Sequence, residues 1–431
     1  RKQRGDLSPR VGLRAASVSS DSFSRNLRDT SRPVDSGGRP CYHPGVSINP
    51  NDPNTWPEAA RALLRRREYA TTGRPELIAL IRERIEAQGP LSFAEFMRLA
   101  LYHPEHGYYT TPDLRFGREG DFLTAPETHP AFGALVCRFL ARLWSRMGAP
   151  ARFTVVEAGA GTGALAAQIW RYAAERHPDL AAALEYLLVE TSPSLRARQQ
   201  RALEAVAANA RWLESLEEIP PGSVEGCLLS NELLDALPVH RVQMTARGLQ
   251  ELYVGLGDGE FCDLPGPLSM PEIEQFFVQV GVMPPEGAIA EVGLEGVAWY
   301  RQAALCLGRG VLLTIDYGYP AAELYTPERP RGTLLCYYRH TTNEDPYRRI
   351  GTQDITAHVD FTALERAGEE AGLQTRALQT QREWLHSLGI EEWLDGRERW
   401  PAGEWPRRDL IALVHPGALG RLRVLEQAKR L

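Results

Sequence analysis

Three glycines stand between an apolar run and a helix-like stretch at residues 155–170, VVEAGAGTGALAAQIW. Gly159, Gly161 and Gly163 allow a tight turn and let the backbone approach a bound molecule closely. The spacing also fits G-x-G-x-x-A, the loose form of the fingerprint that holds the pyrophosphate of a dinucleotide. A tight turn without a ligand is a further interpretation. The glycines therefore predict a strand–turn–helix unit and leave its ligand open.

Two carboxylates near this turn narrow the choice of ligand. Glu157 lies two residues before the first glycine, where it would repel a diphosphate and attract the cationic amino-acid end of S-adenosyl-L-methionine. Glu190 ends the next predicted strand, where a carboxylate can accept hydrogen bonds from a ribose diol, although dinucleotide enzymes place an acid there too. We therefore expect S-adenosyl-L-methionine as cofactor and keep a nicotinamide oxidoreductase as an alternative.

A second polar cluster lies in LLSNELLDALPVHR, residues 228–241. Ser230, Asn231 and Glu232 end an apolar run, and Asp235 follows three residues later. In methyltransferases this strand end faces the transferable methyl group and the substrate, and two carboxylates suit the planar donor fork of a guanidinium. We expect Glu232, Asp235 and Asn231 in catalysis and Ser230 and Asn231 at the cofactor. The alternative is that Asn231 and Asp235 only cap a short helix.

The elements that must position these residues alternate between strand and helix after residue 151, which predicts an α/β fold with a parallel sheet. The richness of residues 1–55 in Arg, Ser, Gly and Pro predicts that this stretch is disordered. We expect an N-terminal helical segment at residues 56–150 and the main domain at residues 151–431. Insertions at about 239–308 and 319–353 predict an α+β cap. The expected helices are 57–70, 75–88, 129–147, 164–176 and 193–209, and Ser92 is expected to cap another.

The composition argues against several classes of protein and kinds of site. The 431 residues carry a net charge of −6, so no global basic field favours nucleic acid. The six cysteines have no C-x-x-C spacing, so we expect small buried hydrophobes and no metal site. No apolar run approaches the roughly 18 residues of a membrane span. Richness in Ala, Arg, Leu and Pro looks bacterial and favours a cytoplasmic location, or a mitochondrial one in a eukaryote.

The chain resembles the MidA family of methyltransferases. The matching stretches occur in order between about residues 76 and 428: LYHPEHGYYT, GDFLTAPETHPAFGALV, EAGAGTGALA, NELLDALPVHR, LLTIDYGY, DITAHVDFTAL and LVHPGALGRLRVLEQ. The resemblance implies a Rossmann-like, seven-stranded S-adenosyl-L-methionine-dependent methyltransferase fold. Its mitochondrial members assist complex I assembly as type II enzymes, dimethylating symmetrically an arginine in the 49-kDa-type subunit of NADH dehydrogenase. A non-catalytic assembly factor that retains the cofactor site is the alternative.

The resemblance extends the list of candidate residues. It implies that GDFLTAPE, residues 120–127, folds over the cofactor, where Asp121, Thr124 and Glu127 could contact the methyl donor or the substrate. His358 and Asp360, in AHVDF, could orient the acceptor or take up the released proton. Each has a simpler interpretation: Thr124 starts a helix, His358 belongs to the core, and Asp360 caps the helix that follows.

Overall fold

The computed structural model describes residues 71–111, 117, 120–121, 123–206, 208–400 and 405–431, all within one compact unit, Asn49–Leu431. The predictions for residues 1–55 and for a helix at 57–70 lie outside the described residues. The boundaries of the N-terminal helical segment, 56–150, and of the main domain, 151–431, stay predictions. No helix of the described part is long and apolar enough to cross a membrane.

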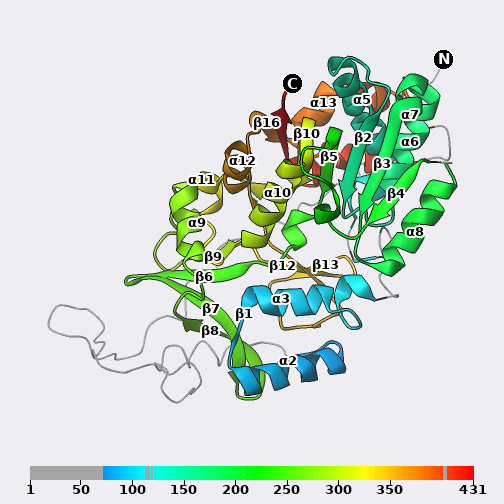
Figure 1. Ribbon diagram of the computed structural model, residues 1–431. Coiled ribbons are helices and arrows are strands. Elements are labelled where there is room, and N and C mark those ends of the chain that lie inside the picture. Colours follow the sequence, from blue (N-terminus) through cyan, green and yellow to red (C-terminus); the bar gives the residue numbers. More distant parts are fainter. Residues whose placement is uncertain (1–70, 112–116, 118–119, 122, 207, 401–404) are drawn as a thin grey trace, which may run out of the picture. The chain divides into compact units, whose positions relative to one another are not determined.

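A seven-stranded sheet forms the centre of this unit, in the order β16-β17-β10-β5-β2-β3-β4 (Figure 1). Neighbouring strands run parallel except at β17, which is antiparallel to both β10 and β16. This is the predicted Rossmann-like α/β fold. The strands are β2 (Phe153–Ala158), β3 (Leu184–Val189), β4 (Ala210–Leu213), β5 (Val224–Asn231), β10 (Leu307–Asp316), β16 (Gln374–Thr380) and β17 (Arg423–Lys429).

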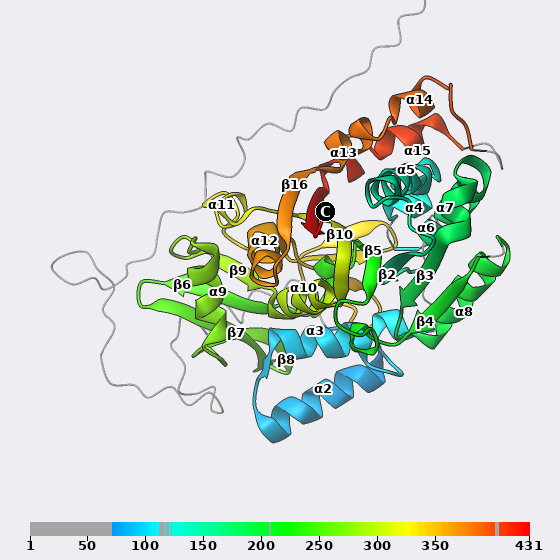
Figure 2. The same ribbon diagram turned by 45° about the horizontal axis from the view of Figure 1, so that its top comes forward.

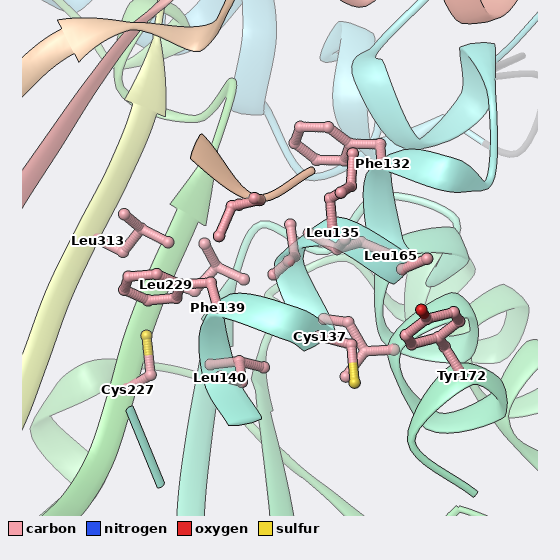
Figure 3. Packing of buried hydrophobic residues seen from close by; sticks show 14 of the residues in the cluster. Phe132, Leu135, Cys137, Phe139, Leu140, Leu165, Tyr172, Cys227, Leu229 and Leu313 are labelled. Atoms are coloured by element: carbon pink, nitrogen blue, oxygen red, sulfur yellow. The ribbon is translucent and has the colours of Figure 1, made fainter. Parts of the chain in front are cut away.

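Helices cover both faces of this sheet, which explains why its strands read as continuous apolar runs. On β5, Cys227 and Leu229 join one buried cluster and Leu228 joins the other, because successive side chains point to opposite faces. Figure 3 shows Leu229 and Leu313 of the sheet near Phe139 on one face. That face carries α5 (Ala131–Arg146) and α6 (Ala164–Arg176), and the other carries α10 (Leu294–Cys306) and α12 (Phe361–Glu370).

Shorter helices complete these layers. In Figure 2 the helices after β16 lie beside α5, and Phe139 of α5 packs on Trp384 of α13, with ring centroids 5.7 Å apart. Helix α8 ends at Glu204, earlier than the predicted residue 209. These helices are α4 (Ala125–Thr128), α7 (Pro178–Ala183), α8 (Pro193–Glu204), α11 (Ala321–Leu324), α13 (Gln381–Ser387), α14 (Glu391–Leu394) and α15 (Arg407–Ala412).

The N-terminal segment and the first insertion share a second sheet. Strand β1 (Leu91–Ser92) pairs antiparallel with β7 (Gly248–Gly257), and Ser92 caps α3 (Phe93–Tyr102) by accepting from the Glu95 N–H at 3.2 Å. Helix α10, placed in the first insertion by the sequence, packs instead on the central sheet. The remaining elements here are α2 (Pro75–Gln88), β6 (His240–Thr245), β8 (Glu260–Gly266), α9 (Glu272–Val280) and β9 (Ile289–Val292).

The second insertion contains a small antiparallel sheet rather than loops alone. Its order is β13-β12-β14, and a separate two-stranded pair joins β11 to β15. The three-stranded sheet and the β11–β15 pair lie in the part of the chain between the central strands β10 and β16, so they follow the carboxyl end of β10. The strands are β11 (Gly318–Tyr319), β12 (Leu335–Tyr338), β13 (Thr341–Asn343), β14 (Asp354–Thr356) and β15 (Val359–Asp360).

Candidate active site

A cavity of about 730 Å³ lies where β2, β3 and β5 end. Its wall combines the glycine turn with residues from α3, α10 and the segment before α5. In open α/β sheets this carboxyl edge is where ligands bind. Of the predicted site residues, the lining includes Glu157, Gly159, Gly161, Glu190, Asn231, Glu232 and Thr124.

The glycine turn needs glycine for different reasons at its positions. Gly159, Gly161 and Gly163 have φ of 66°, 53° and 81°, in the left-handed region that side chains rarely adopt. A Cβ on Gly159 would lie 2.7 Å from Leu233 Cδ1, and one on Gly163 would lie 3.0 Å from Gln199 Cα. Gly163 starts α6 and is not among the residues that line the cavity, so its role is to shape the turn.

Glu157 is buried at the end of β2, with 3% of its surface exposed. The Tyr186 hydroxyl donates to its Oε2 at 2.5 Å. Burial raises the pKa of the Glu157 carboxyl to about 7. A cation in the cavity would favour the ionised form, which suits the ammonium of an amino-acid ligand.

Glu190 is held at the end of β3 by a residue that the sequence analysis missed. Its Oε1 accepts from the Ser192 N–H at 2.9 Å, and its Oε2 accepts from Gln199 Nε2 at 3.0 Å. The same Nε2 donates to the Gly161 carbonyl at 3.0 Å. Gln199 thus ties the glycine turn to Glu190, and it stands on α8 in phase with the buried Leu195 and Leu203. That polar residue within an apolar helical stripe was the available signal.

Two neighbouring polar residues at the end of β5 have different environments. Ser230 is fully buried in the sheet, where its hydroxyl lies 3.1 Å from Thr314 Oγ1, and it does not line the cavity. This corrects its expected place at the cofactor, because successive side chains of a strand point to opposite faces. Asn231 lines the cavity, donates to Glu232 Oε1 at 3.1 Å, and has a buried Oδ1 without a hydrogen-bond partner among the described residues.

The segment before α5 folds against the cavity, as the resemblance implied. Thr124 lines the cavity and immediately precedes α4, so both interpretations of this residue agree with its position. Glu127 Oε1 accepts from the Thr162 hydroxyl in the glycine turn, and Gln168 Nε2 of α6 donates to the Pro126 carbonyl at 2.9 Å. The segment is therefore fixed to the turn that it covers.

A second cavity of about 240 Å³, which we call the acidic chamber, adjoins the first. The two share Tyr109 and Glu232 as lining residues. The chamber is built from the N-terminal segment, the end of β5, the residue after β10 and the β12–β14 sheet. It is lined by Tyr109, Asp121, Leu123, Glu232, Asp235, Tyr317, Tyr337, His340, Thr342, Asp354 and Thr356. In the described part of the chain, no group of three or more His, Cys, Asp or Glu is arranged to hold a metal ion.

Glu232 stands at the junction of the two cavities. Its φ of 51° is left-handed, which is uncommon for a residue other than glycine and is often found at functional sites. Its N–H donates to the Ile315 carbonyl at 2.8 Å, and its Oε1 accepts from the Ala125 N–H at 3.0 Å. Burial raises the pKa of the Glu232 carboxyl to about 8, which suits a group that accepts a proton near neutral pH.

Asp235 lines the chamber beside Asp316, a carboxylate at the end of β10 that we had not assigned to the site. Asp316 is fully buried and accepts from the N–H groups of Leu233 (3.2 Å), Leu234 (2.8 Å) and Tyr317 (2.8 Å). Burial raises the pKa of Asp316 to about 7. Burial and the neighbouring charge of Asp316 raise the pKa of Asp235 well above its usual value. Asp316 therefore fixes the turn that presents Glu232 and Asp235.

Two further carboxylates reach the chamber from distant parts of the chain. Asp354 Oδ1 accepts from the Tyr109 hydroxyl at 2.8 Å and from the Ile355 N–H at 2.9 Å, and burial raises its pKa to about 7. Asp121 accepts from the Tyr108 hydroxyl at 2.7 Å and from the Arg339 N–H at 2.6 Å. Asp121 lies in the wall of the chamber and not of the larger cavity, so of its two expected contacts its position favours the substrate over the cofactor.

His358 and Asp360 line neither the larger cavity nor the acidic chamber. Asp360 Oδ1 accepts from the Ala363 N–H at 3.1 Å and caps α12, as its simpler interpretation held. His358 borders a separate small pocket, stacks on Tyr317 with ring centroids 6.4 Å apart, and has its pKa lowered to about 4 by burial. The structure thus places both outside the site assigned to them, because β15 pairs with β11 at this point.

Comparison with known families defines the class. Residues 135–379 match the family model Methyltransf_28, described as "Putative S-adenosyl-L-methionine-dependent methyltransferase". The chain belongs to this family and is an S-adenosyl-L-methionine-dependent methyltransferase, in agreement with the resemblance noted in its motifs.

Two individual relatives are similar to this chain over most of its length. The chain is 30% identical over 328 residues to the mitochondrial protein arginine methyltransferase NDUFAF7 homolog of Drosophila melanogaster, covering 70% of this chain and 72% of that protein. It is 29% identical over 340 residues to mitochondrial NDUFAF7 of Mus musculus, covering 72% and 73%.

A solved structure supports the cofactor. A COG1565 superfamily member from Burkholderia thailandensis, crystallised with S-adenosyl-homocysteine, is 34% identical to this chain with a TM-score of 0.74, covering 84% of this chain and 95% of that one. The residues present here fit the cofactor. Glu157 and Glu190 bring two carboxylates to the cavity wall that could accept from an ammonium and a ribose, and the unpartnered Asn231 Oδ1 can accept a further hydrogen bond.

Proposed function

We propose that this methyltransferase acts on an arginine side chain of a protein and forms symmetric dimethylarginine, as a type II enzyme. The observation that carries the proposal is the position of Glu232. It belongs to the walls of both cavities, so the cofactor cavity adjoins a chamber lined by four carboxylates. An acidic chamber beside the methyl donor suits a cationic acceptor and disfavours a carboxylate or phosphate one.

The larger cavity would hold S-adenosyl-L-methionine through Glu157, the glycine turn and Glu190. When bound, the cofactor supplies a methyl group on a positively charged sulfur. The residues around it orient it: Gln199 positions Glu190 against the turn, and Thr124 and Glu127 cover the opening from the segment before α5.

On the acceptor side, Glu232 and Asp235 bind and orient the guanidinium. A guanidinium presents five N–H donors in a plane and has no acceptor, so carboxylates are its natural partners. Glu232 also receives the proton that the methylated nitrogen loses. A carboxyl with a pKa of about 8 exchanges protons near neutral pH, and Glu232 is the carboxylate common to both cavities.

The relatives support the same acceptor. The curated relatives compared here are named protein arginine methyltransferases of mitochondria. We propose that the acceptor is a subunit of NADH dehydrogenase, the 49-kDa-type subunit, and that the protein assists assembly of complex I. We place this chain in the cytoplasm, or in mitochondria if its source is eukaryotic.

Transfer of a labelled methyl group tests this function. The full chain would be incubated with tritiated S-adenosyl-L-methionine and purified complex I subunits, and the products hydrolysed to amino acids. We expect label in symmetric dimethylarginine of the 49-kDa-type subunit. Label confined to lysine, to carboxyl esters or to a small metabolite would refute the arginine acceptor. Tight cofactor binding without any transfer would favour a non-catalytic assembly factor.

A further inference from the structure

We infer that the acidic chamber is the acceptor guanidinium site, and that Asp354, positioned by Tyr109, is a substrate-binding carboxylate that acts together with Glu232 and Asp235. This inference rests on the proposed function and extends it to the β12–β14 sheet. Asp354 lies on β14, about 120 residues after the NELLD turn, and no family motif discussed above assigns it a role.

The first argument is charge. Asp121, Glu232, Asp235 and Asp354 face one cavity of about 240 Å³, and the described residues that line it include no Lys or Arg. Carboxylates that share a buried site repel one another and resist ionisation. The charge of Asp354 contributes to the raised pKa of Asp235, and the charge of Asp121 contributes to that of Asp354. A bound cation would relieve this repulsion.

The second argument is the contact between the carboxyls of Asp235 and Asp316. This residue is 8% exposed and lines the chamber. No N–H or O–H among the described residues donates to its side chain, whose partner is the carboxyl of Asp316. Asp316 already accepts from three backbone N–H groups. Two carboxyls in contact repel each other when both are ionised, so this arrangement favours a ligand that brings N–H donors and a positive charge to Asp235.

The third argument is the way in which Asp354 is held. Both described hydrogen bonds to its side chain reach Oδ1, from the Tyr109 hydroxyl and from its neighbour's N–H. The carboxylate is therefore oriented while Oδ2 is left to accept from a ligand. Tyr109 lines both cavities, so it lies at the same junction as Glu232.

The arrangement of the hydrogen-bond acceptors around the chamber favours a guanidinium over an ammonium. Carboxylates from three separate segments surround the chamber, and the planar fork of a guanidinium can donate to several at once. The tyrosines Tyr109, Tyr317 and Tyr337 also line it. Aromatic faces stack well on a guanidinium, and an ammonium lacks this plane.

Binding of a small probe tests the site without requiring turnover. The probe is N-acetyl-L-arginine methylamide, titrated by NMR into the full chain in the presence of S-adenosyl-homocysteine. Asp354→Asn should weaken binding by about tenfold or more, as expected for a lost charge-assisted hydrogen bond. Tyr109→Phe should weaken it less, because the carboxylate remains. The matched control is Glu344→Gln, an exposed residue of the same insertion that pairs with Arg331 and should leave binding unchanged.

The affinity for S-adenosyl-homocysteine serves as the check that Asp354→Asn is folded, and it should not change there because Asp354 does not line the larger cavity. For Tyr109→Phe and Glu232→Gln, which alter residues of both walls, thermal unfolding provides this check. Wild-type affinity for the arginine probe in both Asp354→Asn and Tyr109→Phe, with binding lost in Glu232→Gln, would overturn the role of Asp354. Absence of probe binding to the wild-type protein, or equal binding of N-acetyl-L-lysine methylamide, would overturn the guanidinium site. Normal probe binding without methylation of any arginine would instead defeat the proposed function and leave this site standing.

Discussion

The backbone N–H of Ala125 donates to Oε1 of Glu232 at 3.0 Å across 107 residues of sequence. This contact joins the segment at α4, which lines the larger cavity, to the carboxylate that lines both cavities. Asn231 donates to the same oxygen at 3.1 Å, so Oε1 is held from two sides. The orientation of Glu232 therefore depends on the position of the segment at α4.

Glu232→Gln should separate cofactor binding from transfer. The amide keeps the size of the side chain and removes its charge and its capacity to take a proton. We expect S-adenosyl-homocysteine affinity near that of the wild type, with methyl transfer reduced about 10²-fold or more, as for other lost electrostatic contacts at reacting groups. Titration calorimetry and labelled-methyl transfer measure the two quantities. Glu225→Gln, an exposed residue on the same strand, is the control. An equal loss of both would assign Glu232 to the cofactor.

Gln199→Leu should weaken cofactor binding although Gln199 is not part of the cavity wall. The substitution removes the donor shared by Glu190 and Gly161 and leaves the Trp212 Nε1–H, which donates to Gln199 Oε1 at 2.9 Å, without its partner. We expect about a tenfold loss of S-adenosyl-homocysteine affinity by calorimetry, since one charge-assisted hydrogen bond is lost. Gln200→Leu, exposed on the same helix, should bind normally. Unchanged affinity in Gln199→Leu would show that Glu190 holds its position alone.

The sequence was sufficient for those parts of the fold that depend on local pattern. Helix α6 begins and ends at the predicted residues, and the glycine turn, Glu157, Glu190 and Glu232 all contribute to one cavity. The reason is that the carboxyl ends of parallel strands converge on one edge. Once the strands were identified, the residues that end them had to lie close together.

Residues brought in by long-range packing could not be found in this way. Asp354 reaches the chamber through a small sheet whose position no local periodicity determines, and Asp121 became a candidate only through the family resemblance. Asp360 was expected at the acceptor, although its position before a helix already predicted a helix cap. The structure contains that cap. The position of Ser230 near the end of a strand did not reveal toward which face of the sheet its side chain points.

Gly161→Val should abolish cofactor binding. Gly161 has a φ of 53° and lines the larger cavity, so a branched side chain would both strain the turn and occupy ligand space. Calorimetry should detect no S-adenosyl-homocysteine binding. Gly222→Val controls for backbone strain, because Gly222 also has a left-handed φ, of 69°, and a Cβ there meets nothing within 4 Å. Comparable affinity in the two variants would mean that Gly161 does not approach the ligand.

The acidic chamber should make the ligand-free protein less stable as the pH rises. Folding raises the pKa values of Asp316 and Asp354 to about 7 and of Glu232 to about 8. Groups with raised pKa values stabilise the folded state fully below their unfolded values, and this stability is lost as the pH passes the folded values. The free energy of unfolding should therefore fall between about pH 5 and pH 8.

Asp235→Asn should reduce this pH dependence. The amide removes one buried charge and can donate to Asp316, so at pH 9 the variant should be more stable than the wild type by about 1–3 kcal/mol, the cost of an unsatisfied buried polar group. Thermal and denaturant unfolding at pH 6 and pH 9 measure the difference, with Glu344→Gln as control. A variant with the pH profile of the wild type would show that repulsion at Asp235 is already relieved in the ligand-free protein.

The placement of β17 has a consequence for biosynthesis. In the finished sheet β17 lies between β10 and β16, yet both are made before it. A nascent chain that has emerged as far as β16 still carries an open strand edge along β10, with unpaired backbone groups able to join another chain. Folding of this enzyme on the ribosome therefore has to wait for its last central strand, and a holding chaperone would protect the chain during that interval.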